Sequence, residues 1–146
     1  MRIATWNING LRARLELLLL WLRDRKPDVV GLQELKLQDD QFPRAEIEAA
    51  GYHALVHGQK SWNGVAILSR VGIEDVVTNF GDGTVRDSTA GATIAVSEDD
   101  FDPFDEARMV AATVDGLRVA SLYAPNGRVV GSPFYTGKLA WFERLA

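Results

Sequence analysis

The sequence of 146 residues contains no cysteine and only two histidines, His53 and His57. The absence of cysteine excludes a disulfide framework, a thiolate zinc site and a cysteine nucleophile. The longest unbroken apolar run, residues 17–22, is far shorter than the ~20 residues that span a bilayer. Polar residues also follow Met1 too early for the core of a signal peptide. We therefore expect a cytoplasmic protein without a membrane partner.

The composition is not that of a disordered chain, and charges of one sign do not strongly outnumber those of the other. The chain is 47% hydrophobic and 25% charged, which is ordinary for a globular domain, and its length suits a single domain. The formal charge of −4 argues against broad, nonspecific coating of nucleic acid. This net charge is compatible with a local cluster of basic residues around an acidic metal site.

The opening of the chain predicts a β-strand, a helix and a second β-strand. Residues 2–8 mix β-branched and aromatic types, and residues 29–34 form a nearly continuous apolar run. Between them, leucines recur with helical spacing at Leu11, Leu15, Leu18 and Leu22. Further apolar residues predict that this helix is covered on more than one side: Leu17, Leu20 and Trp21. A strand, helix and strand of this length predict a βαβ unit with parallel strands.

The rest of the chain predicts a short helix, two paired strands, a hairpin and a final helix. These are the helix from Asp39 or Asp40 to Ala50, the strands 53–58 and 64–70, the hairpin strands 109–114 and 117–123, and the helix from Lys138 onward. The hairpin is the clearest of these, because Asp115-Gly116 is a preferred two-residue turn.

Residues 81–106 are the least regular stretch and carry six clustered acidic side chains: Glu98, Asp99, Asp100, Asp102, Asp105 and Glu106. One interpretation is a metal-binding cluster. The other, which we favour, is a solvated surface loop, because runs of like charge repel one another. We predict an irregular acidic insertion at about 82–105.

Two polar residues end the first two predicted strands. Asn7 ends one strand and Glu34 ends the other, and parallel strands place their carboxyl ends on the same edge of a sheet. An amide oxygen and a carboxylate together suit a hard cation such as Mg²⁺. Taken singly, Asn7 could merely shape a turn and Glu34 could be an exposed strand end. The pair leaves both interpretations open.

Five ordered stretches resemble the opening of exonuclease III and the abasic-site (AP) endonucleases. They are residues 6–12 (Trp-Asn-Ile-Asn-Gly-Leu-Arg), 27–36 (Pro-Asp-Val-Val-Gly-Leu-Gln-Glu-Leu-Lys), 58–68 (Gly-Gln-Lys-Ser-Trp-Asn-Gly-Val-Ala-Ile-Leu), 106–108 (Glu-Ala-Arg) and 123–127 (Tyr-Ala-Pro-Asn-Gly). The resemblance implies an α/β fold, part of the four-layered, DNase I-like sandwich of the endonuclease/exonuclease/phosphatase superfamily. We expect one mixed β-sheet with flanking helices, as the N-terminal portion of a single domain that is truncated before its second half.

The resemblance also implies roles for particular residues. Glu34 is similar to the main metal ligand of the family, with Asn7 beside it, for Mg²⁺ or Mn²⁺. Tyr123 matches a tyrosine that contacts the scissile phosphate, and Arg108 matches a phosphate-contacting arginine. Five more residues fall on loops that face nucleic acid in relatives: Lys36, Lys60, Trp62, Asn126 and Arg128. The implied partner is double-stranded DNA with abasic sites or 3′ ends.

Two parts of the family's chemistry have no match in these residues. The family takes its base from a glycine-aspartate-x-asparagine motif and pairs a later aspartate with a histidine. The stretch Gly81-Asp82-Gly83-Thr84 does not match the first motif, and neither histidine lies in the second. We therefore predict a DNA-repair phosphodiesterase of this type that is catalytically incomplete as this chain. The alternatives are a non-catalytic domain that binds nucleic acid or a partner, and a phosphodiesterase with a non-DNA substrate.

One expectation concerns packing. The predicted strands are apolar on both sides, as in sheets covered on both faces, yet only one helix is available to cover them. The second sheet of the resembling fold comes largely from its other half. We expect an exposed apolar face, self-association or a loosely packed, dye-binding state, and a complementary C-terminal half as partner.

Overall fold

The computed structural model describes residues 1–81 and 102–146. Most of the predicted insertion at about 82–105, including Glu98, Asp99 and Asp100, therefore lies outside the described residues. The elements in chain order are β1 (Ile3–Asn7), α1 (Leu11–Arg25), β2 (Val29–Gln33), η1 (Asp39–Gln41), α2 (Arg44–Ala49), β3 (His53–His57), β4 (Val65–Ser69), β5 (Glu74–Thr78), η3 (Pro103–Asp105), β6 (Met109–Val114), β7 (Leu117–Leu122) and α3 (Pro133–Leu145).

The first sheet contains four strands in the order β1-β2-β4-β3. β1 and β2 are parallel and are joined through α1, so the predicted βαβ unit is confirmed. β4 runs antiparallel to both β2 and β3, which confirms the predicted pairing of the third and fourth strands. The sheet is therefore mixed, and β1 and β3 are its edges.

A second sheet, β5-β6-β7, corrects the expectation of one mixed sheet. Its strands are antiparallel, and β6 and β7 are the predicted hairpin, with left-handed φ values of 50° at Asp115 and 75° at Gly116. β5 was not predicted. Its pairing with β6 is interrupted between Glu74 and Val77, and Asp75 has a φ of 49°. A strand broken by a bulge loses the alternation by which strands are recognised in a sequence.

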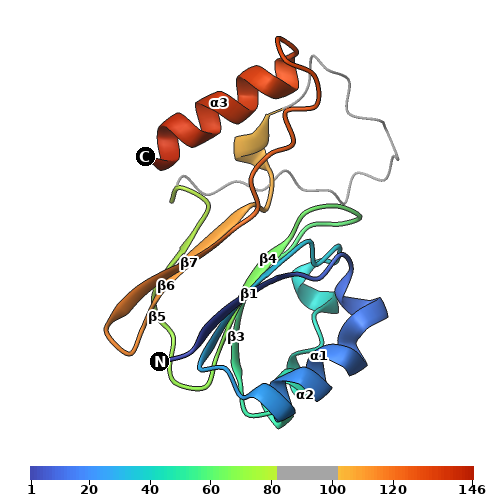
Figure 1. The fold of residues 1–146 in the computed structure, drawn as a ribbon, viewed down its shortest axis with the longest axis vertical. Coiled ribbons are helices and arrows are strands. Elements are labelled where there is room, and N and C mark those ends of the chain that lie inside the picture. Colours follow the sequence, from blue (N-terminus) through green and yellow to red (C-terminus); the bar gives the residue numbers. More distant parts are fainter. Residues whose placement is uncertain (82–101) are drawn as a thin grey trace.

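The two sheets pack face to face, as Figure 1 shows. Buried side chains of the first sheet meet buried side chains of β6: Val29, Val65, Ile67, Val110, Ala112 and Val114. Helices α1 and α2 cover the other face of the first sheet around a second core. The expectation that nothing covers the face opposite the helix is therefore wrong, because the second sheet covers it. The hairpin turns back over β2 and β4 instead of extending their sheet, and three layers of the α/β sandwich result.

Helix α1 buries one stripe of leucines, as predicted, with Leu11, Leu18 and Leu22 fully buried. The expectation that it is covered on more than one side is wrong, because Leu17 and Leu20 are exposed. The helix ends at Arg25, where Lys26 adopts a left-handed conformation ahead of Pro27.

Two predicted helices begin elsewhere than expected. The segment from Asp39 to Ala50 is divided, because Pro43 separates η1 from α2. The last helix begins at Pro133, several residues before Lys138, because Ser132 accepts a hydrogen bond from the Tyr135 backbone N–H as its N-cap. In residues 1–81 and 102–146, no helix has the length and apolar character needed to cross a membrane.

Candidate functional site

Asn7 and Glu34 lie together where β1 and β2 end. The strands are in register, with Asn7 opposite Gln33, so Glu34 follows at the same edge of the sheet. The Asn7 side-chain nitrogen donates a hydrogen bond to Glu34 Oε1 at 2.8 Å. The structure thus brings together the two residues that the strand pattern places at one edge.

The turn that carries Glu34 is held in an unfavourable backbone conformation. Glu34 and Lys36 both have φ of 57°, in the left-handed region that non-glycine residues seldom adopt. Backbone bonds hold the turn from two sides: Gly10 N–H donates to Glu34 O at 2.8 Å, and Leu35 N–H donates to Gly64 O at 3.1 Å. Such strain persists where the surroundings over-determine it, and it is common at functional sites.

Tyr123 completes a cluster around the Glu34 carboxylate. A hydrogen bond from Asn7 is the main cause that lowers the pKa of Glu34, and further bonds from Tyr123 and Lys36 act in the same direction. Burial, followed by the bond to Glu34, raises the pKa of Tyr123. At neutral pH the carboxylate is therefore ionised and the phenol keeps its proton.

Lys36 is bound into this cluster as well. Its ammonium group lies 3.4 Å from Glu34 Oε2 and donates to Asn9 Oδ1 at 2.6 Å. It also lies 5.7 Å from the centroid of the Trp62 ring, which is 69% exposed. The predicted loop residues Lys36 and Trp62 thus adjoin the Glu34 cluster, with an exposed aromatic face beside a cation.

Arg108 is buried rather than presented to solvent. Its guanidinium group donates to the Glu106 carboxylate through Nε at 2.6 Å, and Nη2 pairs with the same carboxylate oxygen at 2.5 Å. Nη1 donates to the Tyr123 carbonyl at 3.1 Å. Glu106 was not predicted as a site residue. Its place two residues before Arg108, within one quoted motif, is the signal that could have found it.

The loop 58–64 is built by its own polar side chains. Gln59 Oε1 accepts from Asn63 Nδ2 at 3.1 Å and from the Ala107 backbone N–H at 3.0 Å. These bonds tie the loop to the start of β6. Lys60 is exposed on this loop, as a residue that meets solvent or a ligand would be.

Asn126 and Arg128 stabilise the loop that leads into α3. Asn126 Oδ1 accepts from the Arg128 backbone N–H at 2.9 Å, and the Arg128 guanidinium group stacks 3.7 Å from the centroid of Phe134. Both residues are exposed. The structure thus gives each a role within its own loop.

The donor set around Glu34 fits a magnesium site of limited strength. Glu34 supplies a carboxylate, but Asn7 turns its nitrogen toward it, and Asn7 Oδ1 accepts from the Asn9 backbone N–H at 3.2 Å. The Asn7 amide would have to rotate before its oxygen could face a metal held by Glu34. The structure therefore differs from the expected pair of an amide oxygen and a carboxylate. The described residues hold no group of three His, Asp or Glu side chains that could bind a metal. Mg²⁺ is often held by one or two carboxylates with waters and substrate phosphates, which this set allows.

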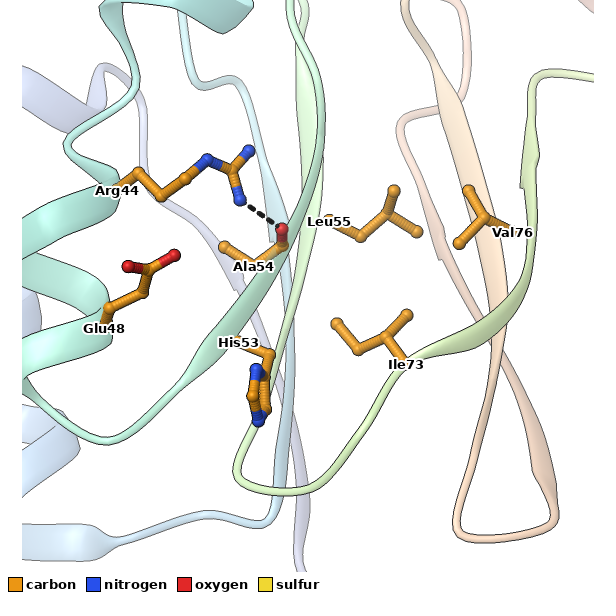
Figure 2. A pocket seen from close by; sticks show the side chains of 7 residues that line it. All are labelled: Arg44, Glu48, His53, Ala54, Leu55, Ile73 and Val76. Atoms are coloured by element: carbon orange, nitrogen blue, oxygen red, sulfur yellow. Dashed lines mark hydrogen bonds between the residues drawn. The ribbon is translucent and has the colours of Figure 1, made fainter.

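Both histidines lie outside the cluster. His57 is buried, its Nε2 has no hydrogen-bond partner, and burial lowers its pKa. His53 lines a pocket of about 280 Å³ between α2, β3 and β5 (Figure 2), whose other lining residues are Arg44, Glu48, Ala54, Leu55, Ile73 and Val76. The register pairs Val29 with Ser69 and Ser69 with His53, so this pocket lies at the end of the sheet opposite Glu34.

The arrangement of sheets and site can be compared with known proteins. Residues 4–142 match the model of the Endonuclease/Exonuclease/phosphatase family. The chain belongs to this family. It is 47% identical to exodeoxyribonuclease III of Haemophilus influenzae over 70 residues, which are 48% of the chain and 26% of that protein. It is 27% identical to an exodeoxyribonuclease of Bacillus subtilis over 99% of the chain and 50% of that protein.

Solved structures of the exonuclease III and AP endonuclease group are similar along nearly the whole chain. A 3′ phosphatase of Neisseria bound to a product DNA hairpin gives a TM-score of 0.80 at 39% identity, covering 99% of this chain and 49% of that one. An AP endonuclease of Archaeoglobus fulgidus gives 0.79 at 36% identity, with the same coverage. The resemblance stated from the motifs and the sandwich fold are confirmed. The chain spans about half the length of these solved relatives.

Proposed function

We propose that this chain carries part of the active site of a divalent-metal-dependent DNA phosphodiesterase of the exodeoxyribonuclease III and AP endonuclease type. The single observation that supports this most is the cluster of Asn7, Glu34 and Tyr123 at the carboxyl edge of β1 and β2. It joins an ionised carboxylate to a protonated phenol, the groups expected beside a metal and a phosphate. Similarity to a 3′ phosphatase solved with a product DNA hairpin supports DNA as the substrate.

In this proposal Glu34 holds Mg²⁺ or Mn²⁺, with Asn7 next to it, and the bound cation supplies Lewis-acid polarisation of a phosphate oxygen. Tyr123 donates its hydroxyl proton in a hydrogen bond to the phosphate. Lys36, Lys60, Trp62, Asn126 and Arg128 meet the DNA backbone or its bases. Arg108 acts on phosphate only through the N–H groups that Glu106 and the Tyr123 carbonyl leave free.

We propose further that the 146 residues alone are catalytically incomplete. A positioned general base contributes about 10²–10⁴-fold to a hydrolysis rate, and none of the residues described around Glu34 is placed for that role. The alternatives from the sequence, a non-catalytic binding domain and a phosphodiesterase with another substrate, remain outcomes of the test. The cytoplasmic location stays a prediction.

Two measurements on the chain test the proposal. A Mn²⁺ titration followed by paramagnetic broadening should affect resonances around Glu34 first, with a Kd on the order of a millimolar or weaker because one carboxylate carries the site. Glu34→Gln should abolish the broadening there, whereas the matched control Glu46→Gln, on the exposed surface of α2, should leave it unchanged. Broadening unchanged in Glu34→Gln would remove Glu34 from the site.

The second measurement is incision of duplex DNA with an abasic site in the presence of Mg²⁺. The chain alone should show no incision above background, and activity should appear when the remaining half of a relative's domain is supplied with it. Binding of DNA without incision in either case would favour the non-catalytic alternative. Hydrolysis of a phosphodiester other than DNA would favour the alternative of a phosphodiesterase with a non-DNA substrate. Turnover by the chain alone that is lost in Glu34→Ala would overturn the proposed incompleteness.

A further inference from the structure

We infer that Gln59 is a positioning residue, whose side-chain oxygen clamps the loop 58–64 onto the start of β6. The clamp holds Lys60 and Trp62, at the exposed tip of this loop, in place. Gln59 lies in the connection between β3 and β4 of the first sheet, whereas β6 belongs to the second sheet. The role toward DNA rests on the proposed function, in which Lys60 and Trp62 meet DNA. The clamp itself rests on hydrogen bonds alone.

A single oxygen atom makes the clamp. Gln59 Oε1 accepts from the Ala107 backbone N–H at 3.0 Å and from Asn63 Nδ2 at 3.1 Å. The first bond crosses from one sheet to the other, and the second joins the two ends of the exposed tip, residues 60–62. A backbone N–H can only donate, so the Gln59 amide must present its oxygen here. The clamp therefore requires a hydrogen-bond acceptor of this length at position 59.

The backbone of Ala107 is bonded to the loop through both its N–H and its carbonyl group. The N–H donates to Gln59, and the carbonyl oxygen accepts from Gly64 N–H at 3.0 Å. Ala107 is fully buried, so an unpaired N–H at this position would be costly. It also lies between Glu106 and Arg108, whose side chains pair with each other. The clamp thus connects the loop to the segment that carries this ion pair.

The conformation of the tip needs support from outside the tip. Ser61 and Asn63 have φ of 69° and 57°, in the left-handed region that non-glycine residues seldom adopt, and Gly64 follows with 85°. The tip has a backbone hydrogen bond of its own, from Trp62 N–H to Lys60 O at 2.8 Å. A strained segment keeps its conformation only where its surroundings determine it. Gln59 supplies part of that surrounding structure, because it bonds both Asn63 and β6.

The loop is attached to the first sheet independently of the clamp. The backbone N–H groups of Leu35 and Lys36 donate to residues 63–64 at 3.1 and 3.0 Å, and Gln59 N–H donates to Leu37 O at 3.0 Å. Removing the Gln59 side-chain oxygen should therefore leave the loop joined to β3 and β4 and the fold intact. It should release the conformation of the tip and its position relative to β6.

The test uses the whole chain and three variants. Gln59→Met removes the acceptor while keeping the length of the side chain, and Gln59→Glu keeps an acceptor at the same position. The matched control is Gln41→Met, because Gln41 is exposed and its side-chain oxygen bonds within η1. Two signals are followed by NMR: hydrogen exchange of the Ala107 amide, and the fluorine signal of fluorotryptophan at position 62, assigned with Trp62→Phe.

In Gln59→Met the Ala107 amide should exchange faster by on the order of tenfold or more, because its acceptor is lost. The fluorine signal of Trp62 should shift as the tip changes conformation. Gln59→Glu should restore both signals to near their wild-type values, and Gln41→Met should change neither. The amides of β2 should keep their protection in every variant. If Gln59→Met does not fold, Gln59→Ala gives the same comparison.

Binding of a short duplex with an abasic site measures the role toward DNA. Gln59→Met should weaken binding by the wild-type chain by roughly threefold or more, because contacts of the tip are lost. It should add almost nothing in a chain that already carries Lys60→Gln and Trp62→Phe, because the contacts that it positions are already weakened. Gln59→Glu is left out of this arm, since its new charge would repel phosphate.

Wild-type exchange of the Ala107 amide in Gln59→Met would overturn the clamp. Equal loss of protection throughout β2 would also overturn it, because the variant would then report general loosening of the fold. Equal weakening of DNA binding in the chain without Lys60 and Trp62 would overturn the positioning role. A wild-type chain that binds no DNA would count against the proposed function, while the exchange and fluorine signals would still decide the clamp.

Discussion

At the scale of single residues, the pKa of the Glu34 carboxyl group depends on the side chains that donate hydrogen bonds to it. Asn7 contributes most to lowering its pKa, ahead of Tyr123 and Lys36. A metal that binds Glu34 must compete with Lys36, whose ammonium group lies 3.4 Å from Oε2. The site therefore holds its own counter-ion in the absence of a cation, which keeps the carboxylate ionised and lowers its affinity for Mg²⁺.

Replacing Asn7 by alanine should make the stability of the chain less dependent on pH. The folded-state pKa of Glu34 lies below its ordinary value of 4.5, so the stabilisation is fully present above that value and is lost as pH falls through the folded pKa. Asn7→Ala should thus be less stable than the wild type at pH 7, and the difference should shrink as the pH falls below about 4.5. Urea unfolding of both proteins across pH 3–7 measures it.

The exposed Asn126 serves as the control for this series, because Asn126→Ala removes an amide that does not touch Glu34. A pH-independent difference between Asn7→Ala and the wild type would contradict the assigned cause.

Asn7, Glu34 and Tyr123 could be named from the sequence because a strand pattern and a motif place them. Glu106 could have been found from its place beside Arg108 in one motif. The hydrogen bond between Gln33 and Ser121 could not be predicted, since it joins two different sheets.

At the scale of elements, the sequence predicts the strands more reliably than it predicts which sheet they join. The hairpin of β6 and β7 is encoded by Asp115-Gly116, a local signal. Its docking on β2 and β4 depends on contacts between residues far apart in the chain, such as Ile67 and Val110. β5 is harder still to predict from the sequence, because a bulge interrupts it. Two arginines add bonds to strand carbonyls: Arg44 donates to Ala54 O on the edge strand β3 (Figure 2), and Arg118 on β7 reaches Asp75 O at the bulge of β5.

Gly58→Ala should destabilise the chain by about 1–3 kcal/mol through overpacking at the start of the loop 58–64. A Cβ atom at Gly58 would lie 2.5 Å from Leu37 O and 2.8 Å from Asp39 Oδ1, and backbone cannot yield as a flexible side chain can. The Gly58 N–H also donates to Asp39 Oδ1. Urea unfolding measures the loss.

Gly72→Ala is the matched control, since nothing lies within 4 Å of a Cβ atom there. It should leave the unfolding midpoint almost unchanged or raise it slightly, because alanine lowers the entropy of the unfolded chain. Equal effects at the two glycines would show that the loop is not packed as described.

At the scale of the whole molecule, the candidate site faces one end of the sandwich while α1 runs away from it toward Arg25 (Figure 1). If the chain binds DNA, Lys60→Gln should weaken binding alike for all sequences and should reduce the salt dependence of log Kd by about one unit of slope. Arg25→Gln, at the end of α1 that is far from the site, should change neither. Binding that does not depend on salt would point to a stacking surface or a protein partner instead.

The packing of two sheets revises the expectation of a loose, self-associating chain. The interface between them has an apolar centre, with Val29, Val65 and Val110 fully buried. Some apolar side chains near the free edges of β1 and β7 remain exposed, among them Ile3 and Leu117. The closed core predicts cooperative unfolding of the chain by itself, and the free edges predict stabilisation by the complementary half.

Val110→Ala tests whether the sheets form one cooperative unit. The change removes two methyl groups from the inter-sheet core and should cost about 1–3 kcal/mol, lowering the urea midpoint for every probe. The probes should include the ring contact of Trp6 with Trp21, which lies on the far side of the first sheet. Val129→Ala, on a side chain that is 71% exposed, should have almost no effect. A Val110→Ala variant in which the Trp6 signal keeps the wild-type midpoint while β6 melts early would show that the second sheet folds separately from the first.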